Sequence, residues 1–187
     1  MPSPRTEPAP TGLMVALLRR ADDALVLGHR LSEWCGHAPS LEEDLALANI
    51  ALDQIGLARW LYAEAGRMTG RTEDELAYLR TDREYRNCLL VEQPNGDFAQ
   101  TIIRQLLYSA FADPFWRAAC ASGNAELAAI AGKAEKEAAY HLRHAAEWVV
   151  RLGDGTDESH RRAAAALDML WRFTEELFET DAAEAEL

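Results

Sequence analysis

The 187-residue sequence is poor in cysteine and in basic residues, and it has no long uninterrupted apolar run. Its three cysteines, Cys35, Cys88 and Cys120, stand far apart without a CxxC pair, which argues against a disulfide framework or a zinc ribbon. We expect all three to be small buried hydrophobic residues in reducing surroundings. No apolar run approaches the ~20 residues of a membrane span. Residues Met1 to Arg5 lack the basic-then-apolar pattern of a signal peptide. The sequence therefore predicts a cytoplasmic protein.

Basic residues are outnumbered, with 19 Lys and Arg against 31 Asp and Glu, so the formal net charge is −12. An acidic surface of this size repels phosphate backbones and anionic membranes, which argues against both as partners. Apolar residues make up 49% of the chain, enough for a sizeable core. The acidic excess leaves one question open, namely whether any carboxylate is placed to hold a metal.

Several sequence motifs of known chemistry are also missing. The chain has no GxGxxG or GxxxxGK[ST] phosphate-binding motif and no nucleophile elbow. It also lacks an alternating apolar–polar run of useful length, so strands are not predicted. What remains are long helical patterns joined by short loops. These predict an all-α fold, an antiparallel helical bundle.

The bundle is expected to occupy residues 12–181. Four prolines fall within the first ten residues, so residues 1–11 are expected to form a disordered arm. Residues 182–187 are expected to be an acidic, frayed tail. Capping and breaking residues bound the predicted helices, which are Gly12 to Cys35, Ser40 to Gly70, Thr72 to Arg80, Asp97 to Cys120, Asn124 to Leu152, and a last one capped by Thr156.

Two local signals carry these boundaries. Ser40 followed by Glu43, and Thr72 followed by Glu75, both have capping-box spacing, in which each side chain bonds the other's backbone N–H. The helix that follows Ser40 is apolar nearly all round, so we expect it to be central and packed on several sides. The stretch from Thr81 to Gly96 is expected to be irregular.

Long antiparallel bundles often house a carboxylate-bridged di-iron centre. Such a centre needs a Glu from each of two helices and a Glu-x-x-His pair from each of the other two. The second predicted helix has no histidine and, from Leu45 to Ala63, a single carboxylate, Asp53. Its expected inward residues are Asn49 and Leu52. The third predicted helix has no Asp or Glu at all from Phe98 to Ala112. Two of the four helices therefore lack the ligands.

The fourth predicted helix comes closest to the ligand pattern. The residue three after Glu137 is a tyrosine, and the histidines His141 and His144 follow at four and seven. The first helix offers His29 and Glu33, which are four apart and share one face. Because the ligand set is incomplete, no working di-iron site is predicted.

The fourth helix still carries a stripe of residues at helical spacing, which is Ile130, Ala134, Glu137, His141, His144 and Trp148. We interpret the stripe as a buried polar network around Glu137 and His141. Its partners across the bundle would be Asp53, Asn49 or Tyr108. Two alternatives stay open, namely a single metal ion held by Glu137, His141 or His144, and a merely solvated face.

Several long motifs of the chain are similar to the PaaC-type subunit of phenylacetyl-CoA oxygenase (epoxidase). The resemblance extends from Asp22 to Phe178. The motifs that carry it are Leu27 to Pro39, Glu42 to Asp44, Ala48 to Asp53, Val91 to Ala99, Lys136-Glu137 with Tyr140 to His144, Arg151 to Thr156, and Glu158 to Arg162.

The resemblance implies a ferritin-like helical subunit that is structural and non-catalytic and binds no cofactor. A related ferritin-like partner would carry the di-iron centre and form a stable core complex with it. A reductase would pass electrons from NADPH, and the complex would epoxidise the ring of phenylacetyl-CoA in aerobic phenylacetate breakdown. On this interpretation a vestigial polar core is formed by Glu33, Asn49, Asp53, Glu137, His141 and His144.

Two other functions are compatible with the sequence. The first is an independent di-iron or mononuclear oxidase using Glu33, Asp53, Glu137, His141 and His144. The second is a helical homodimer without any link to an oxygenase. Members of the resembled family continue with a further helical stretch, whereas this sequence ends at Leu187. The absence of that stretch would leave Trp171, Phe173 and Phe178 exposed.

Overall fold

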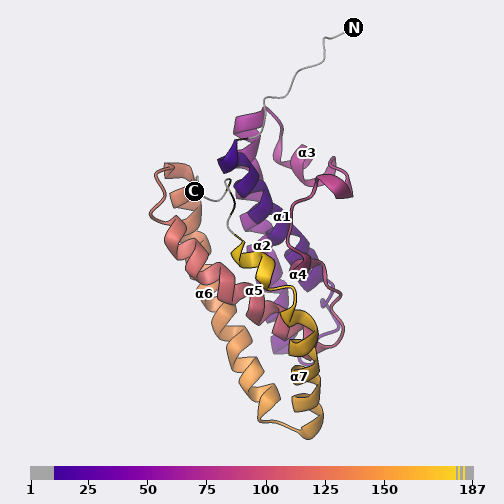
Figure 1. Cartoon of the computed structure of the whole chain (residues 1–187). Helices are drawn as coiled ribbons and strands as arrows, with labels where there is room; N and C mark the ends of the chain where they lie inside the picture. Colours follow the sequence, from indigo (N-terminus) through magenta and orange to yellow (C-terminus); the bar gives the residue numbers. More distant parts are fainter. Residues whose placement is uncertain (1–10, 180, 182, 184–187) are drawn as a thin grey trace.

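The computed structural model describes residues 11–179, 181 and 183. Within this part every regular element is a helix and no strand occurs (Figure 1). The predicted arm at 1–11 and the tail at 182–187 lie outside the described residues, apart from residues 11 and 183. The elements are α1 (Gly12–Ser32), α2 (Leu41–Thr69), α3 (Glu73–Tyr78), the 3₁₀ turn η1 (Asp82–Glu84), α4 (Leu89–Glu92), α5 (Phe98–Ala119), α6 (Ala125–Gly153), α7 (Asp157–Trp171) and the 3₁₀ turn η2 (Glu175–Phe178).

The four long helices form two hairpins. α1 packs along α2, and α5 packs along α6, with short loops making each pair antiparallel. The crossover from α2 to α5 carries the short helices α3 and α4, while α7 folds back against α5 and α6 (Figure 1). The expected all-α, ferritin-like bundle is confirmed.

Side-chain caps begin the helices where the sequence predicts them. Thr72 and Glu75 form the predicted capping box, and the Asp97 and Thr156 side chains cap α5 and α7. The Ser40 hydroxyl accepts the Glu43 N–H, as expected. The predicted bond from the Ser40 backbone N–H to the Glu43 carboxylate is wrong. That carboxylate is buried and bonds a histidine of α6 instead. The first helix also ends earlier than predicted, at Ser32.

Helix α2 packs against α1, α3 and α6, as expected for a helix with several neighbours, but it is not apolar and buried all round. Leu41, Leu45 and Leu52 are 71%, 57% and 66% exposed, so one face of α2 lies in solvent. Apolar composition alone did not reveal this, because both faces of the helix are rich in leucine and alanine.

The close contact between α1 and α2 depends on a glycine. A Cβ atom at Gly28 would lie 2.9 Å from Ile55 Cγ1 and 3.2 Å from the Ala51 carbonyl oxygen. Real side chains do not tolerate the shorter of these contacts without a shift of a neighbour. Gly28 therefore allows the two helix backbones to approach closely at the level of Ile55.

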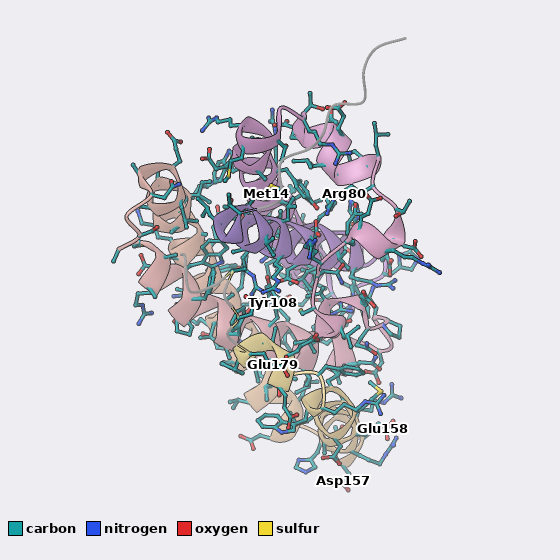
Figure 2. All side chains as sticks on the ribbon, turned by 45° about the horizontal axis from the view of Figure 1, so that its top comes forward. Met14, Arg80, Tyr108, Asp157, Glu158 and Glu179 are labelled. Atoms are coloured by element: carbon teal, nitrogen blue, oxygen red, sulfur yellow. The ribbon has the colours of Figure 1, made fainter. Side chains whose placement is uncertain are left out.

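Two adjacent carboxylates of α1 are fully buried, and both bind the crossover. Asp22 accepts a hydrogen bond from the Tyr62 hydroxyl at 2.6 Å and from the Arg86 N–H at 2.7 Å, and it forms an ion pair with Arg80. Asp23 accepts the Cys88 N–H at 2.7 Å. In Figure 2, Arg80 lies on the α3 side of the molecule. These bonds hold residues 80–88 against the α1–α2 hairpin.

The end of the crossover is organised by a second buried charge. Arg104 of α5 is 1% exposed, and its guanidinium donates to the Gln93 carbonyl at 2.5 Å and to Asn95 Oδ1 at 2.6 Å. The Asn95 amide donates in turn to Arg30 O and to Glu33 Oε2. Burial, with the nearby Arg30 charge adding to the effect, lowers the pKa of Arg104 to about 10. The stretch expected to be irregular is therefore tightly bonded although it has little regular structure.

The aromatic residues near the end of the chain and the cysteines differ in exposure. Trp171 and Phe178 are 61% and 69% exposed, and Phe173 is half-buried.

Cys88 is buried, but Cys35 is exposed and Cys120 is intermediate, so the expectation of three buried cysteines is wrong. No helix in the described part of the chain combines the length and apolar character that crossing a bilayer requires.

The buried ion pair yields a stability prediction. We expect Asp22→Asn to lower the free energy of unfolding by about 3 kcal/mol, because it leaves the Arg80 guanidinium buried without its counter-charge. Urea denaturation at neutral pH measures this loss. Asp168→Asn, at an exposed position of α7, is the control and is expected to change stability by less than about 0.5 kcal/mol. Similar losses in the two variants would contradict the role assigned to Asp22.

Candidate functional site

The polar centre of the bundle lies between α2, α5 and α6. His141 of α6 is 1% exposed and faces Gln54 and Asp53 of α2. The Gln105 amide donates to the Ser109 hydroxyl at 3.2 Å, both on α5 and both buried. Amide, hydroxyl and imidazole groups therefore meet inside the bundle, the region into which a di-iron bundle projects its metal ligands.

Both nitrogens of the His141 ring are engaged. Nε2 lies 3.1 Å from Asp53 Oδ2, and Nδ1 lies 3.3 Å from Gln54 Nε2. A carboxylate only accepts hydrogen bonds, so Nε2 carries the proton, and Nδ1 accepts from the amide. Neither ring nitrogen of His141 therefore has a lone pair directed at a metal.

Beside His141 there is little free volume. A cavity of about 10 Å³ is bordered by Gln54, Ser109, Glu137 and His141, among others. This is about the space of one water molecule and far less than two metal ions with their bridging ligands occupy. Small side chains from α5 and α6, such as Ala112 and Ala138, complete its wall.

The residues of the centre do not fit a di-iron cofactor. On α6 the buried residue three before His141 is Ala138, so a Glu-x-x-His pair is absent there. Helix α2 has no histidine, and the buried residue three before Gln54 is Ala51. Among the described residues, no group of three or more His, Cys, Asp or Glu side chains is arranged to hold a metal ion.

Only part of the predicted polar core comes together. Asp53, Glu137 and His141 border the same small cavity. His144 lies one turn further along α6 and bonds Glu43 Oε2 at 2.9 Å, so a second imidazole–carboxylate pair links α6 to α2. Its Nδ1 atom is buried without a hydrogen-bond partner.

Two of the predicted core residues lie elsewhere. Asn49 is exposed on α2, on the side away from the core, and its neighbour Leu52 is exposed as well. Glu33 is exposed at the end of α1, where it pairs with Arg30 at 3.1 Å and accepts a bond from Asn95. The structure therefore does not bring Glu33 or Asn49 to His141.

Tyr108, a third possible partner of Glu137, lies near the Asp23 side of α1. Its ring is buried, and burial raises the pKa of its hydroxyl well above the ordinary value, with Asp23 adding to the shift. Figure 2 shows Tyr108 near the middle of the bundle. It therefore belongs with the buried acids of α1.

The sequence reasoning also missed some buried polar residues. These are Gln54, Gln105 and Ser109 at the bundle centre, Asp22 and Asp23 on α1, and Arg104 on α5. A signal for Asp22 existed, because it stands four after Leu18 and three before Leu25 on one apolar face. Gln54 likewise stands three after Ala51 and three before Leu57.

At this centre, the surroundings of Glu137 shift the pKa of its carboxyl group. Its side chain is 16% exposed and pairs with Lys133 at 3.3 Å. Burial raises the pKa of the Glu137 carboxyl, and the Asp53 carboxylate adds to the shift, while Lys133 opposes it. Ionisation of Glu137 is therefore harder in the folded protein than in the unfolded chain.

This shift determines the sign of a pH-dependent prediction. A raised folded-state pKa means that ionisation of Glu137 destabilises the native state as pH rises through that pKa. We expect Glu137→Gln to be more stable than the original protein at pH 7, and the difference to shrink at pH 4, where Glu137 is protonated. Thermal unfolding at both pH values measures it, with exposed Glu147→Gln on the same helix as the control. A loss of stability at pH 7 would contradict the predicted sign.

Comparisons with known proteins identify the family of the chain. The family model described as "Phenylacetic acid catabolic protein" (PaaA_PaaC) matches residues 3–187. The chain is 52% identical over 165 residues to a subunit of the 1,2-phenylacetyl-CoA epoxidase of Escherichia coli (strain K12). That match covers 88% of this chain and 66% of the relative, so the chain corresponds to just under two thirds of the relative's length. The chain belongs to the phenylacetic acid catabolic protein family, PaaA_PaaC.

Proposed function

We propose that the chain is the structural subunit of a multicomponent 1,2-phenylacetyl-CoA epoxidase and holds no di-iron centre of its own. The observation that carries this proposal is the state of His141. The imidazole at the bundle centre has both ring nitrogens bonded to protein side chains and lies beside a cavity of about 10 Å³. A ferritin-like bundle filled in this way has no room for oxygen chemistry at its centre.

The family membership supports the assignment to phenylacetate catabolism. The relative in Escherichia coli is named as one subunit of an epoxidase, which by that name has further subunits. Extending that role to this chain is part of the proposal, because the match covers 66% of the relative. An identity of 52% over the matched region makes a similar role the simplest interpretation.

A subunit without redox groups requires partners that carry them. We propose a related ferritin-like subunit that supplies the di-iron centre, together with a reductase that delivers electrons. When bound in that partner, the di-iron centre supplies the activated oxygen for epoxidation. This chain would contribute a rigid helical body that supports the catalytic subunit.

The alternative of an independent oxidase has less support. It needs Glu33 to converge with Asp53, Glu137, His141 and His144. Glu33 is exposed at the end of α1 and bonded to Arg30 and Asn95, while His144 is bonded to Glu43. Glu33 and His144, two of the five residues that this site would need, are therefore engaged elsewhere.

Metal counting on separated chains tests the proposal. We expect this chain, co-expressed with the di-iron subunit and then separated from it, to hold far less than one iron per chain, because both nitrogens of the central His141 are already hydrogen-bonded. The partner is expected to keep its iron. Stoichiometric iron in this chain, or failure of the two chains to co-purify at micromolar concentration, would overturn the proposal.

A substitution at the bundle centre separates a structural from a catalytic role. We expect His141→Leu in the assembled complex to leave turnover per iron unchanged within about twofold, while it lowers the melting temperature of this subunit. Tyr140→Leu, at the exposed neighbouring position, is the matched control. A loss of iron or a tenfold fall in turnover in His141→Leu alone would instead favour a metal-binding role for His141.

A further inference from the structure

The solvent-facing side of α2 carries an apolar stripe with heptad spacing. We define the α2 seam as Leu41, Leu45, Ala48, Leu52 and Ile55, with successive spacings of four, three, four and three residues. This spacing is that of the a and d positions through which one helix packs against another. The three leucines of the seam are all more than half exposed. No described element of the chain covers them.

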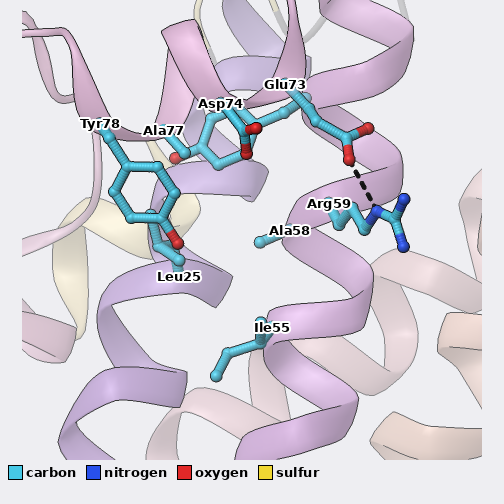
Figure 3. Close-up of a pocket in the computed structure, with 9 residues that line it drawn as sticks. Leu25, Ile55, Ala58, Arg59, Glu73, Asp74, Ala77 and Tyr78 are labelled. Atoms are coloured by element: carbon cyan, nitrogen blue, oxygen red, sulfur yellow. Dashed lines mark hydrogen bonds and ion pairs between the residues drawn. The ribbon is translucent and has the colours of Figure 1, made fainter.

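The seam leads into a pocket between α1, α2 and α3. The pocket has a volume of about 300 Å³. It is lined by Ile55, the last residue of the seam, and by Arg59, one turn further along α2. Figure 3 shows Leu25, Ala58 and Ala77 around its apolar interior and Tyr78 on one side. A pocket of this size accepts one large apolar side chain of a docked helix.

The charges beside the seam and the pocket are mainly acidic. Glu42 and Asp44 lie beside the start of the seam, and Glu73 and Asp74 lie at the pocket. The cation at the pocket, Arg59, is paired with Glu73 at 2.7 Å, drawn as the dashed line in Figure 3. The border of this surface therefore has a net negative charge and is complementary to a basic partner.

We propose that the α2 seam and the adjoining pocket form the docking surface for an amphipathic helix of a partner subunit. That helix has apolar residues at heptad spacing, basic residues flanking them, and one large apolar side chain that enters the pocket. A second copy of this chain fits less well, because it would bring the same acidic border and a net charge of −12. The inference rests on the proposed function only for the source of the partner, the di-iron subunit.

Three charge-adding variants test the surface. Leu45→Glu and Leu52→Glu place a carboxylate in the seam, and Val150→Glu places one at a 61% exposed position of α6. The three variants have the same net charge, so a non-specific electrostatic effect changes them equally. Circular dichroism melts verify that each is folded, which we expect because all three positions face solvent.

The first measurement is the affinity of each variant for the purified di-iron subunit. We expect the original chain and Val150→Glu to bind alike, and the two seam variants to bind at least ~30-fold more weakly, as for a central interface residue. Equal binding by all four would overturn the inference while the proposed function stands. A homodimer of this chain alone that Leu52→Glu abolishes would also overturn it, in favour of a second copy.

A second measurement needs no natural partner. A synthetic three-heptad helix with Leu at a and d and Lys at e and g is titrated by fluorescence anisotropy, beside a Glu-flanked version. We expect the Lys-flanked helix to bind at least ~10-fold more tightly, and Leu52→Glu but not Val150→Glu to abolish its binding. If the original chain does not bind the di-iron subunit, the proposed function fails, and this titration alone decides the inference. Equal binding of both peptides, or equal loss in both variants, would overturn it.

Discussion

Two neighbouring carboxylates in the middle of α1 determine how the two helical hairpins are joined. Asp22 and Asp23 are fully buried, and each accepts a backbone N–H from the crossover, from Arg86 and Cys88 respectively. Charges without water are costly unless they are paired and hydrogen-bonded. The crossover therefore has one favourable position, against α1, and the start of α5 follows from it. Arg104 performs the same task at the other end by bonding residues 93 and 95.

The bundle centre and the bundle surface both differ from what a metal-binding bundle requires. At the centre, hydrogen bonds among Gln54, Asp53 and His141 fill the space where ligands would converge on metal ions. At the surface, α2 carries leucines that a single chain gains nothing by exposing. In the proposed function, a bundle with a hydrogen-bonded centre and an apolar outer helix is suited to supporting another subunit.

Local features of the fold could be predicted from the sequence, and long-range ones could not. Thr72, Asp97 and Thr156 were identified as caps because a cap depends on residues within one turn. The burial of Asp22 was missed because its partner Arg80 lies 58 residues away. Asn49 was assigned to the core because α2 is apolar on both faces, and only the packing of α1 against it decides which face is inside. His141, expected on an inward stripe, is buried, and its neighbour Gln54 could not be foreseen as a partner because it carries no charge and lies on another helix.

Gly28 links the interior of the hairpin to its outer surface. The glycine on α1 has its nearest side-chain neighbour in Ile55, and Ile55 is also the residue at which the α2 seam and the pocket meet. A side chain at position 28 would lie too close to Ile55 Cγ1 and to the Ala51 carbonyl oxygen, so Ile55 or the spacing of the two helices would have to shift. The shape of the surface around Ile55 therefore depends on the spacing between α1 and α2. Sequence drift at a fully buried position can in this way change which partners the exposed face accepts.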